Sequence, residues 1–112
     1  MIRYFLIILG FTFTLIVACQ KEEDVIDCSD ENTSYNADIK SIINPNCLSS
    51  GCHNKGSNNG DFTTYDGLKA AALSGALEKR VVTDKSMPPS APLFLGDRKK
   101  IKCWIESGAP NN

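Results

Sequence analysis

The chain has 112 residues, of which 42% are hydrophobic and 22% charged, and its formal net charge is −1 at pH 7. This length leaves room for one small domain. The near-neutral charge and the scatter of the basic residues argue against a nucleic-acid-binding protein, so no nucleic-acid partner is expected.

The N-terminus predicts an export signal followed by a lipid anchor. Arg3 precedes a nearly unbroken apolar run from Phe5 to Ala18, which is short for a membrane span but typical of a signal peptide. The run ends in Leu-Ile-Val-Ala-Cys, which resembles a bacterial lipobox. We therefore expect residues 1–18 to be a lipoprotein signal peptide and Cys19 to carry a lipid that anchors the protein without spanning the membrane. An ordinary signal or an anchoring helix with a chance cysteine is the alternative.

Residues 19–34 predict an acidic, flexible tether. Six acidic residues and one lysine lie in this segment, which has too little apolar surface to offset the entropy of ordering. From Asn32 onward there are 10 basic and 7 acidic residues, so the domain differs from its tether in charge. Gln-Lys-Glu-Glu-Asp directly after Cys19 also resembles the export signal of surface-exposed lipoproteins in Bacteroidota. The expected location is the cell envelope, on an outer membrane, facing the periplasm or the cell surface.

Residues 35–112 predict an all-α domain of three to four helices. Apolar residues recur at helical spacing in Asn36–Ile43, where Asn36 is the expected cap and Pro45 the expected stop, and in Asp97–Gly108, capped by Asp97. A third helix should start after Thr64, run through Ala72 and continue over Leu73–Val82 beyond a break near Gly75. Val81-Val82-Thr83 is the best strand candidate, and it is short.

The cysteines leave several pairings open. Besides Cys19 the chain has Cys28, Cys47, Cys52 and Cys103, and free thiols do not persist in an oxidising compartment. Four cysteines allow three full pairings. If Cys47 and Cys52 attached a cofactor, only Cys28 and Cys103 would remain to form a disulfide.

The segment Asn46–Asn54, NCLSSGCHN, is the candidate functional motif. His53 is the only histidine in the chain and directly follows Cys52, as in the C-x-x-C-H signature of covalent haem c, but the two cysteines are separated by four residues. Gly51 permits the positive φ that the longer insert requires. A Cys47–Cys52 disulfide loop and a zinc site are the alternatives, although neighbouring Cys52 and His53 are poor simultaneous zinc ligands.

Met87 is the candidate second iron ligand. With one histidine in the chain, the other axial ligand of a haem must be a thioether or water, and Met87 is the only methionine after the signal peptide. It lies in Ser-Met-Pro-Pro, where the prolines limit the conformational entropy lost when the sulfur is held in place. A gap-filling core methionine is the alternative.

These landmarks occur in a fixed order: Asp38–Ile43, Asn46-Cys47, Gly51–His53, Gly60–Phe62, Tyr65–Leu68, Ser86–Pro89, and Ile101 with Trp104–Pro110. In this order residues 35–112 resemble class I-type cytochrome c domains, in particular those of envelope proteins of Planctomycetes and Bacteroidota. The resemblance implies a small cytochrome c-like fold around one covalently bound haem c, in which the first and last helices cross. It implies thioether links at Cys47 and Cys52, His53 as the proximal iron ligand and Met87 as the distal one.

The resemblance implies a lipid-anchored monohaem cytochrome that carries single electrons between redox proteins of the cell envelope. We do not expect an enzyme, because a six-coordinate iron has no open position for substrate. A haem-based sensor or peroxidase is the alternative if Met87 does not bind iron. A haem-free, disulfide-stapled interaction module is the alternative if Cys47 and Cys52 pair. Arg80 is considered as a haem-propionate partner, or else as a solvated arginine, and Lys99, Lys100 and Lys102 as a docking patch for an acidic partner.

Overall fold

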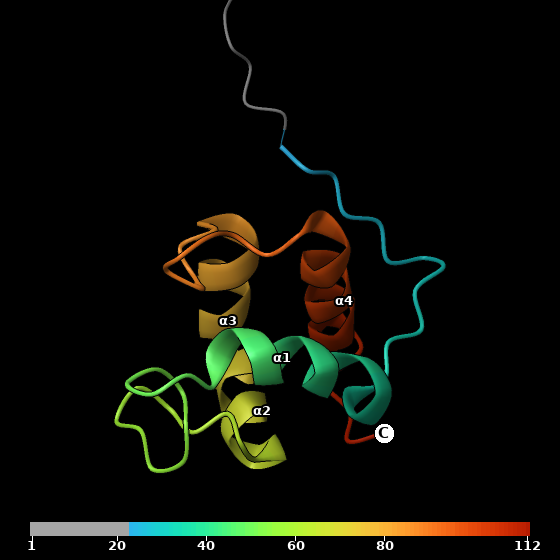
Figure 1. The fold of residues 1–112 in the computed structure, drawn as a ribbon. Coiled ribbons are helices and arrows are strands. Elements are labelled where there is room, and N and C mark those ends of the chain that lie inside the picture. Colours follow the sequence, from blue (N-terminus) through green and yellow to red (C-terminus); the bar gives the residue numbers. More distant parts are fainter. Residues whose placement is uncertain (1–22) are drawn as a thin grey trace, which may run out of the picture.

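The computed structural model describes residues 23–112, so the predicted signal peptide and the predicted lipid at Cys19 lie outside the described residues. The described chain is helical and contains no strand, which confirms the all-α class (Figure 1). No helix within this part of the chain has the length and apolar character needed to cross a membrane. The elements, in order, are the π-helical turn η1 (Tyr35–Ile39), α1 (Lys40–Cys47), α2 (Tyr65–Leu73), α3 (Ala76–Glu78), the π-helical turn η2 (Lys79–Thr83) and α4 (Leu95–Glu106).

The first helical segment begins at Ser34 and not at the predicted cap Asn36. The Ser34 hydroxyl accepts from the Ala37 amide at 3.3 Å, and the Asp38 carboxylate accepts from the Ser34 amide at 2.9 Å. These reciprocal bonds form a capping box, with its acidic partner one residue later than usual because the first turn is π-helical. Asn36 instead donates, through its backbone and its side chain, to the carbonyl oxygen of Asn112.

Two predicted helix boundaries were also wrong. The helix does not stop at Pro45 but continues through α1 to Cys47. Proline has no amide to bond one turn back, here to Ser41, and its ring crowds that carbonyl, but Ser41 is exposed, so its carbonyl can tilt outward to water. Helix α4 starts at Leu95, because the Arg98 amide already donates to the Phe94 carbonyl at 3.0 Å, and Asp97 lies inside the first turn. There its charge still favours the helix N-terminus.

The middle of the chain follows its local signals more closely. The Thr64 side chain caps α2 by accepting from the Gly67 amide at 3.1 Å, as predicted. The predicted break falls at Gly75, whose φ of +80° suits glycine, and α3 and η2 follow it. The strand candidate was wrong: Val81, Val82 and Thr83 belong to η2, where Val81 is buried in the helical core.

The core joins the two ends of the domain. Trp104 of α4 is fully buried, stacks on Tyr35 of η1 with ring centroids 5.9 Å apart, and donates from its indole nitrogen to the Pro110 carbonyl at 2.9 Å. The Tyr65 hydroxyl donates to the Ala109 carbonyl at 2.7 Å, which ties α2 to the C-terminal segment. The other side chains that are almost completely buried are Ile39, Ile43, Leu68 and Ile101. The first and last helical segments therefore pack on each other.

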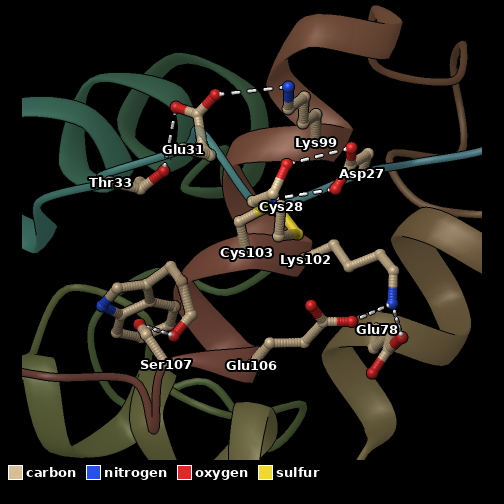
Figure 2. Close-up of a disulfide and its surroundings, with 12 residues drawn as sticks. Asp27, Cys28, Glu31, Thr33, Glu78, Lys99, Lys102, Cys103, Glu106 and Ser107 are labelled. Atoms are coloured by element: carbon tan, nitrogen blue, oxygen red, sulfur yellow. Dashed lines mark hydrogen bonds and ion pairs between the residues drawn. A yellow bond between two sulfur atoms is a disulfide. The ribbon is translucent and has the colours of Figure 1, made fainter.

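The described part of the predicted tether, residues 23–34, is joined to the helices. Cys28 forms a disulfide with Cys103 of α4 (Figure 2). Glu31 lies 3.7 Å from the ammonium of Lys99, also on α4. From Asp24 onward the segment is thus part of the folded structure and has contacts that its acidic composition did not predict.

The basic residues of α4 are paired within the chain. Lys100 lies 2.7 Å from the Asp38 carboxylate, and Lys102 bridges Glu78, at 3.3 Å, and Glu106 (Figure 2). Together with the Lys99–Glu31 pair, these contacts neutralise much of the patch that the sequence suggested as a docking surface for an acidic partner.

Candidate functional site

One cavity of about 470 Å³ holds the predicted site residues. Cys47, Cys52, His53 and Met87 all line it, although Met87 is 34 residues beyond His53 in the chain. Most of the remaining wall is apolar and comes from the loop 54–62, from α2, α3 and η2, and from the loop that joins η2 to α4. These apolar residues are Phe62, Ala71, Ala76, Leu77, Val81, Pro88 and Pro89.

The cysteine loop starts where α1 ends. The Cys47 carbonyl accepts from the His53 amide at 3.0 Å, and within this closure the Ser49 carbonyl accepts from the Cys52 amide at 2.9 Å. Gly51 has a φ of +81° in this inner turn, which is the conformation expected for the insert. The four inserted residues therefore bulge as a compact turn, and Cys47, Cys52 and His53 still line the same cavity.

His53 is held on two sides by the loop that follows it. Its ring stacks on Phe62 with centroids 3.9 Å apart and planes 1° from parallel. Its Nδ1 lies 3.2 Å from the Gly60 carbonyl oxygen, which can only accept, so Nδ1 carries the proton. In the neutral imidazole the lone pair then lies on Nε2, where it can bind a metal, and the hydrogen bond at Nδ1 fixes the orientation of the ring.

Met87 lies on a loop that is anchored at both ends. At its start, the Arg80 carbonyl of η2 accepts from the Ser86 amide at 2.9 Å and from the Met87 amide at 3.2 Å. At its end, the Arg98 guanidinium donates to the Leu93 carbonyl at 3.0 Å. The Met87 side chain is 37% exposed at the rim of the cavity. The proline-rich loop is therefore fixed by backbone contacts as well as by its composition.

The two cysteines of the site are free thiols, whereas Cys28 and Cys103 are bonded to each other. Burial, with a smaller contribution from Cys52, raises the pKa of the Cys47 thiol to about 11. A thiol with such a pKa is almost entirely protonated at neutral pH and reacts slowly in disulfide exchange. The site thus contains two separate thiols and no Cys47–Cys52 bridge.

The described residues do not form the ligand cluster of a structural zinc site. Within residues 23–112 no three side chains among His, Cys, Asp and Glu come close enough to share a metal ion. Zinc usually requires four such ligands. The donor set of the cavity is instead two thiols, one imidazole and one thioether.

Several groups that position the site residues could not be recognised from the sequence. Gly60 and Phe62 belong to one of the segments on which the family resemblance rests. Only the fold shows that Phe62 stacks on His53 and that the Gly60 carbonyl lies within hydrogen-bond distance of it. The Arg80 carbonyl that anchors Met87 has no sequence signal at all. The Arg80 side chain also lines the cavity.

Comparison with known proteins adds no assignment, since no protein-family model, curated protein sequence or solved structure matches this chain.

Proposed function

We propose that the chain is a lipid-anchored monohaem c-type cytochrome with a small cytochrome c-like fold. Haem c would be attached through Cys47 and Cys52, with His53 and Met87 as the iron ligands. The protein would carry single electrons between redox proteins of the cell envelope. The observation that carries the proposal is that these four side chains, including the chain's sole histidine, line one apolar cavity.

The residues present suit the chemistry of this group. The two thiols are unpaired, as two thioether links require, and Nε2 of His53 is free to coordinate. The thioether of Met87 is the only other soft donor on the cavity wall. A volume of about 470 Å³ lies within the range of roughly 300–1,000 Å³ that is usual for ligand and cofactor sites. When bound, haem c supplies a one-electron couple between ferrous and ferric iron.

The chain's own residues would set the environment of that couple. Gly60 and Phe62 hold the His53 ring in one orientation, and the Arg80 carbonyl holds the backbone of Met87. Leu77 and Val81 exclude water from the wall of the cavity. If His53 and Met87 both bound the iron, no coordination position would be left for a substrate, which would favour electron transfer over catalysis.

The decisive experiment is a pyridine haemochrome spectrum of the full chain, co-expressed with a cytochrome c maturation system and extracted with acid–acetone. We expect a c-type α-band that stays with the protein, and loss of this band in a Cys47→Ser/Cys52→Ser variant. If all the haem is extracted from the unmodified chain, or none is present, the covalent attachment and the electron-transfer function are both wrong.

A further inference from the structure

The N-terminal segment meets the helical domain at one end of the molecule. In Figure 1 the described chain starts near the beginning of α4, on the same side as the loop that joins η2 to α4. The loop 54–62 lies toward the opposite end in the same view. The position of the first contact between segment and domain therefore decides which end of the protein faces the predicted anchor.

Within residues 23–112, Asp24 makes the first contact of the segment with the helical domain. Its carboxylate accepts from Lys85 Nζ at 2.7 Å and from Arg98 Nη1 at 2.7 Å. Arg98 is only 7% exposed and also holds the Leu93 carbonyl, so Asp24 is bound to a fixed part of the domain. The next attachment is the Cys28–Cys103 disulfide, four residues further along the chain.

The distance from the predicted lipid to this contact is short. Asp24 follows Cys19 by five residues, which span at most about 18 Å in any conformation. If Asp24 were released, the domain would be held first at Cys28, nine residues from Cys19, and the reach would grow to about 32 Å. The Asp24 contact thus keeps this end of the domain close to the bilayer.

Large apolar side chains are exposed at the same end. Phe94 is 86% exposed and Leu95 47%, and both lie one turn before Arg98 on the chain. Val25, which directly follows Asp24, is 92% exposed. Among the large apolar residues of the described chain only Leu73 and Met87 share such exposure, and Met87 belongs to the proposed site.

We infer that Val25, Phe94 and Leu95 form a seating surface that rests on the lipid bilayer. The inference depends on the lipid anchor at Cys19 that forms part of the proposed function. A bilayer is the occupant that the geometry favours, since a lipid at Cys19 would permanently hold Asp24, and with it this end of the domain, within about 18 Å of the anchored residue. Exposed aromatic and aliphatic side chains in that position enter the boundary between headgroups and acyl chains, about 5–10 Å deep.

The contact is apolar in character. Lys85 and Arg98 share the single Asp24 carboxylate, so these three groups together keep one net positive charge, which is a weak attraction for lipid headgroups. Instead of moving freely on a flexible tether, the domain would present the Met87 loop toward the membrane and the loop 54–62 away from it.

Lipid photo-cross-linking tests this orientation. The full chain, purified from membranes, is reconstituted into phosphatidylcholine vesicles that contain a phospholipid with a diazirine near the headgroup end of its acyl chain. After illumination, lipid adducts are mapped by mass spectrometry. We expect adducts concentrated at Val25 and at Phe94–Leu95, with a yield that does not change between low and high salt.

Matched variants separate the possible outcomes. Phe94→Ser/Leu95→Ser should lower the adduct yield several-fold across the surface, Asp24→Asn should lower it by lengthening the reach, and the control Leu73→Ser should leave it unchanged. Adducts spread evenly over the domain, or gathered on the loop 54–62, would overturn the inference while a lipid mass at Cys19 upheld the anchor. Absence of both lipid mass and adducts would overturn the inference together with the anchor, and the haemochrome spectrum would still decide the haem proposal separately.

Discussion

Gly60, beside His53, has a backbone conformation that favours glycine and lies close to two side chains, and both features can be tested. Its φ is +101°, and a Cβ added there would lie 3.3 Å from Phe62 Cε1 and 3.9 Å from His53 Nδ1. We expect Gly60→Ala to lower the free energy of unfolding by about 1–3 kcal/mol through backbone strain. The push against the ring of Phe62 should add to this loss. Urea unfolding measures it.

Gly56→Ala is the matched control for this prediction. Gly56 lies in the same loop with a φ of +74°, but nothing lies within 4 Å of an added Cβ. Gly56→Ala should therefore show only the penalty of the backbone conformation, and it should lose less unfolding free energy than Gly60→Ala. Equal losses in the two variants would mean that the close packing of Gly60 against the stacked rings of Phe62 and His53 contributes nothing to stability.

Met87 gives the sharpest single-residue test of the proposed iron ligation. Leucine fills nearly the same volume, at a cost usually below about 1.5 kcal/mol, but has no lone pair for iron. Met87→Leu should therefore keep covalently attached haem while the optical spectrum changes from low-spin to high-spin. A low-spin spectrum that survives the substitution would show that Met87 is not the ligand. A high-spin spectrum in the unmodified protein would favour the sensor or peroxidase alternative.

At the scale of elements, α2 and the site loop meet at Gly67. A Cβ on Gly67 would lie 1.8 Å from the Asp61 carbonyl oxygen, a backbone atom that cannot move without displacing the loop. We expect Gly67→Ala to cost about 3 kcal/mol or more, as severe overpacking does. Thermal or urea unfolding would detect this loss readily.

Gly96, in helix α4, serves as the control, because the same substitution should have the opposite effect on stability there. It lies in the first half of α4, and nothing lies within 4 Å of an added Cβ. Gly96→Ala should therefore stabilise the chain by about 0.5–1 kcal/mol, because alanine restricts the unfolded state and favours the helix. If Gly67→Ala left the stability unchanged or raised it, the close approach of α2 to Asp61 would be refuted.

Elements were predictable where their signals are local. The Thr64 cap and the break at Gly75 depend on neighbouring residues only, and both were correct. Asn36 has the same local cap signal, but its side chain bonds to Asn112, 76 residues away, and Ser34 caps the segment instead. Val81 and Val82 have strand-like propensity, but the packing of the helical core around Val81 outweighs it.

The candidate site divides in the same way. Its donors could be named from residue types and spacing, since two cysteines, the sole histidine and one methionine leave few combinations. The groups that orient those donors could not be named. The Gly60 and Arg80 carbonyls act through the backbone, which every residue possesses.

For the molecule as a whole, the Cys28–Cys103 disulfide closes a loop with a sequence separation of 75 (Figure 2). Cross-linking residues so far apart restricts the unfolded chain, and this loop length corresponds to about 4 kcal/mol. Cys28→Ser/Cys103→Ser should lose roughly that much unfolding free energy in guanidinium titrations. The unmodified chain under reducing conditions should match the variant, and equal stability in oxidised and reduced forms would contradict the prediction.

Acid should destabilise the fold through the carboxylates that attach the N-terminal segment and η1. Hydrogen bonds from Lys85 and then Arg98 hold the pKa of Asp24 below its ordinary 3.8. The Lys100 ammonium and then the Ser34 amide do the same for the pKa of Asp38. The unfolded chain therefore takes up protons at higher pH than the folded chain. This stabilisation is present above pH 3.8 and is lost as the pH falls through the lowered values.

Asp24→Asn/Asp38→Asn should be less stable than the unmodified chain at neutral pH and should lose less stability as the pH falls below 3.8. Urea midpoints measured across that range test both statements. Asp30→Asn is the control, because Asp30 is exposed and in no ion pair within residues 23–112, so its substitution should leave the profile unchanged. If the double variant kept the full acid dependence of the unmodified chain, the contacts of Asp24 and Asp38 would contribute nothing to folding, and the N-terminal segment would be held by the Cys28–Cys103 disulfide and the Glu31–Lys99 pair.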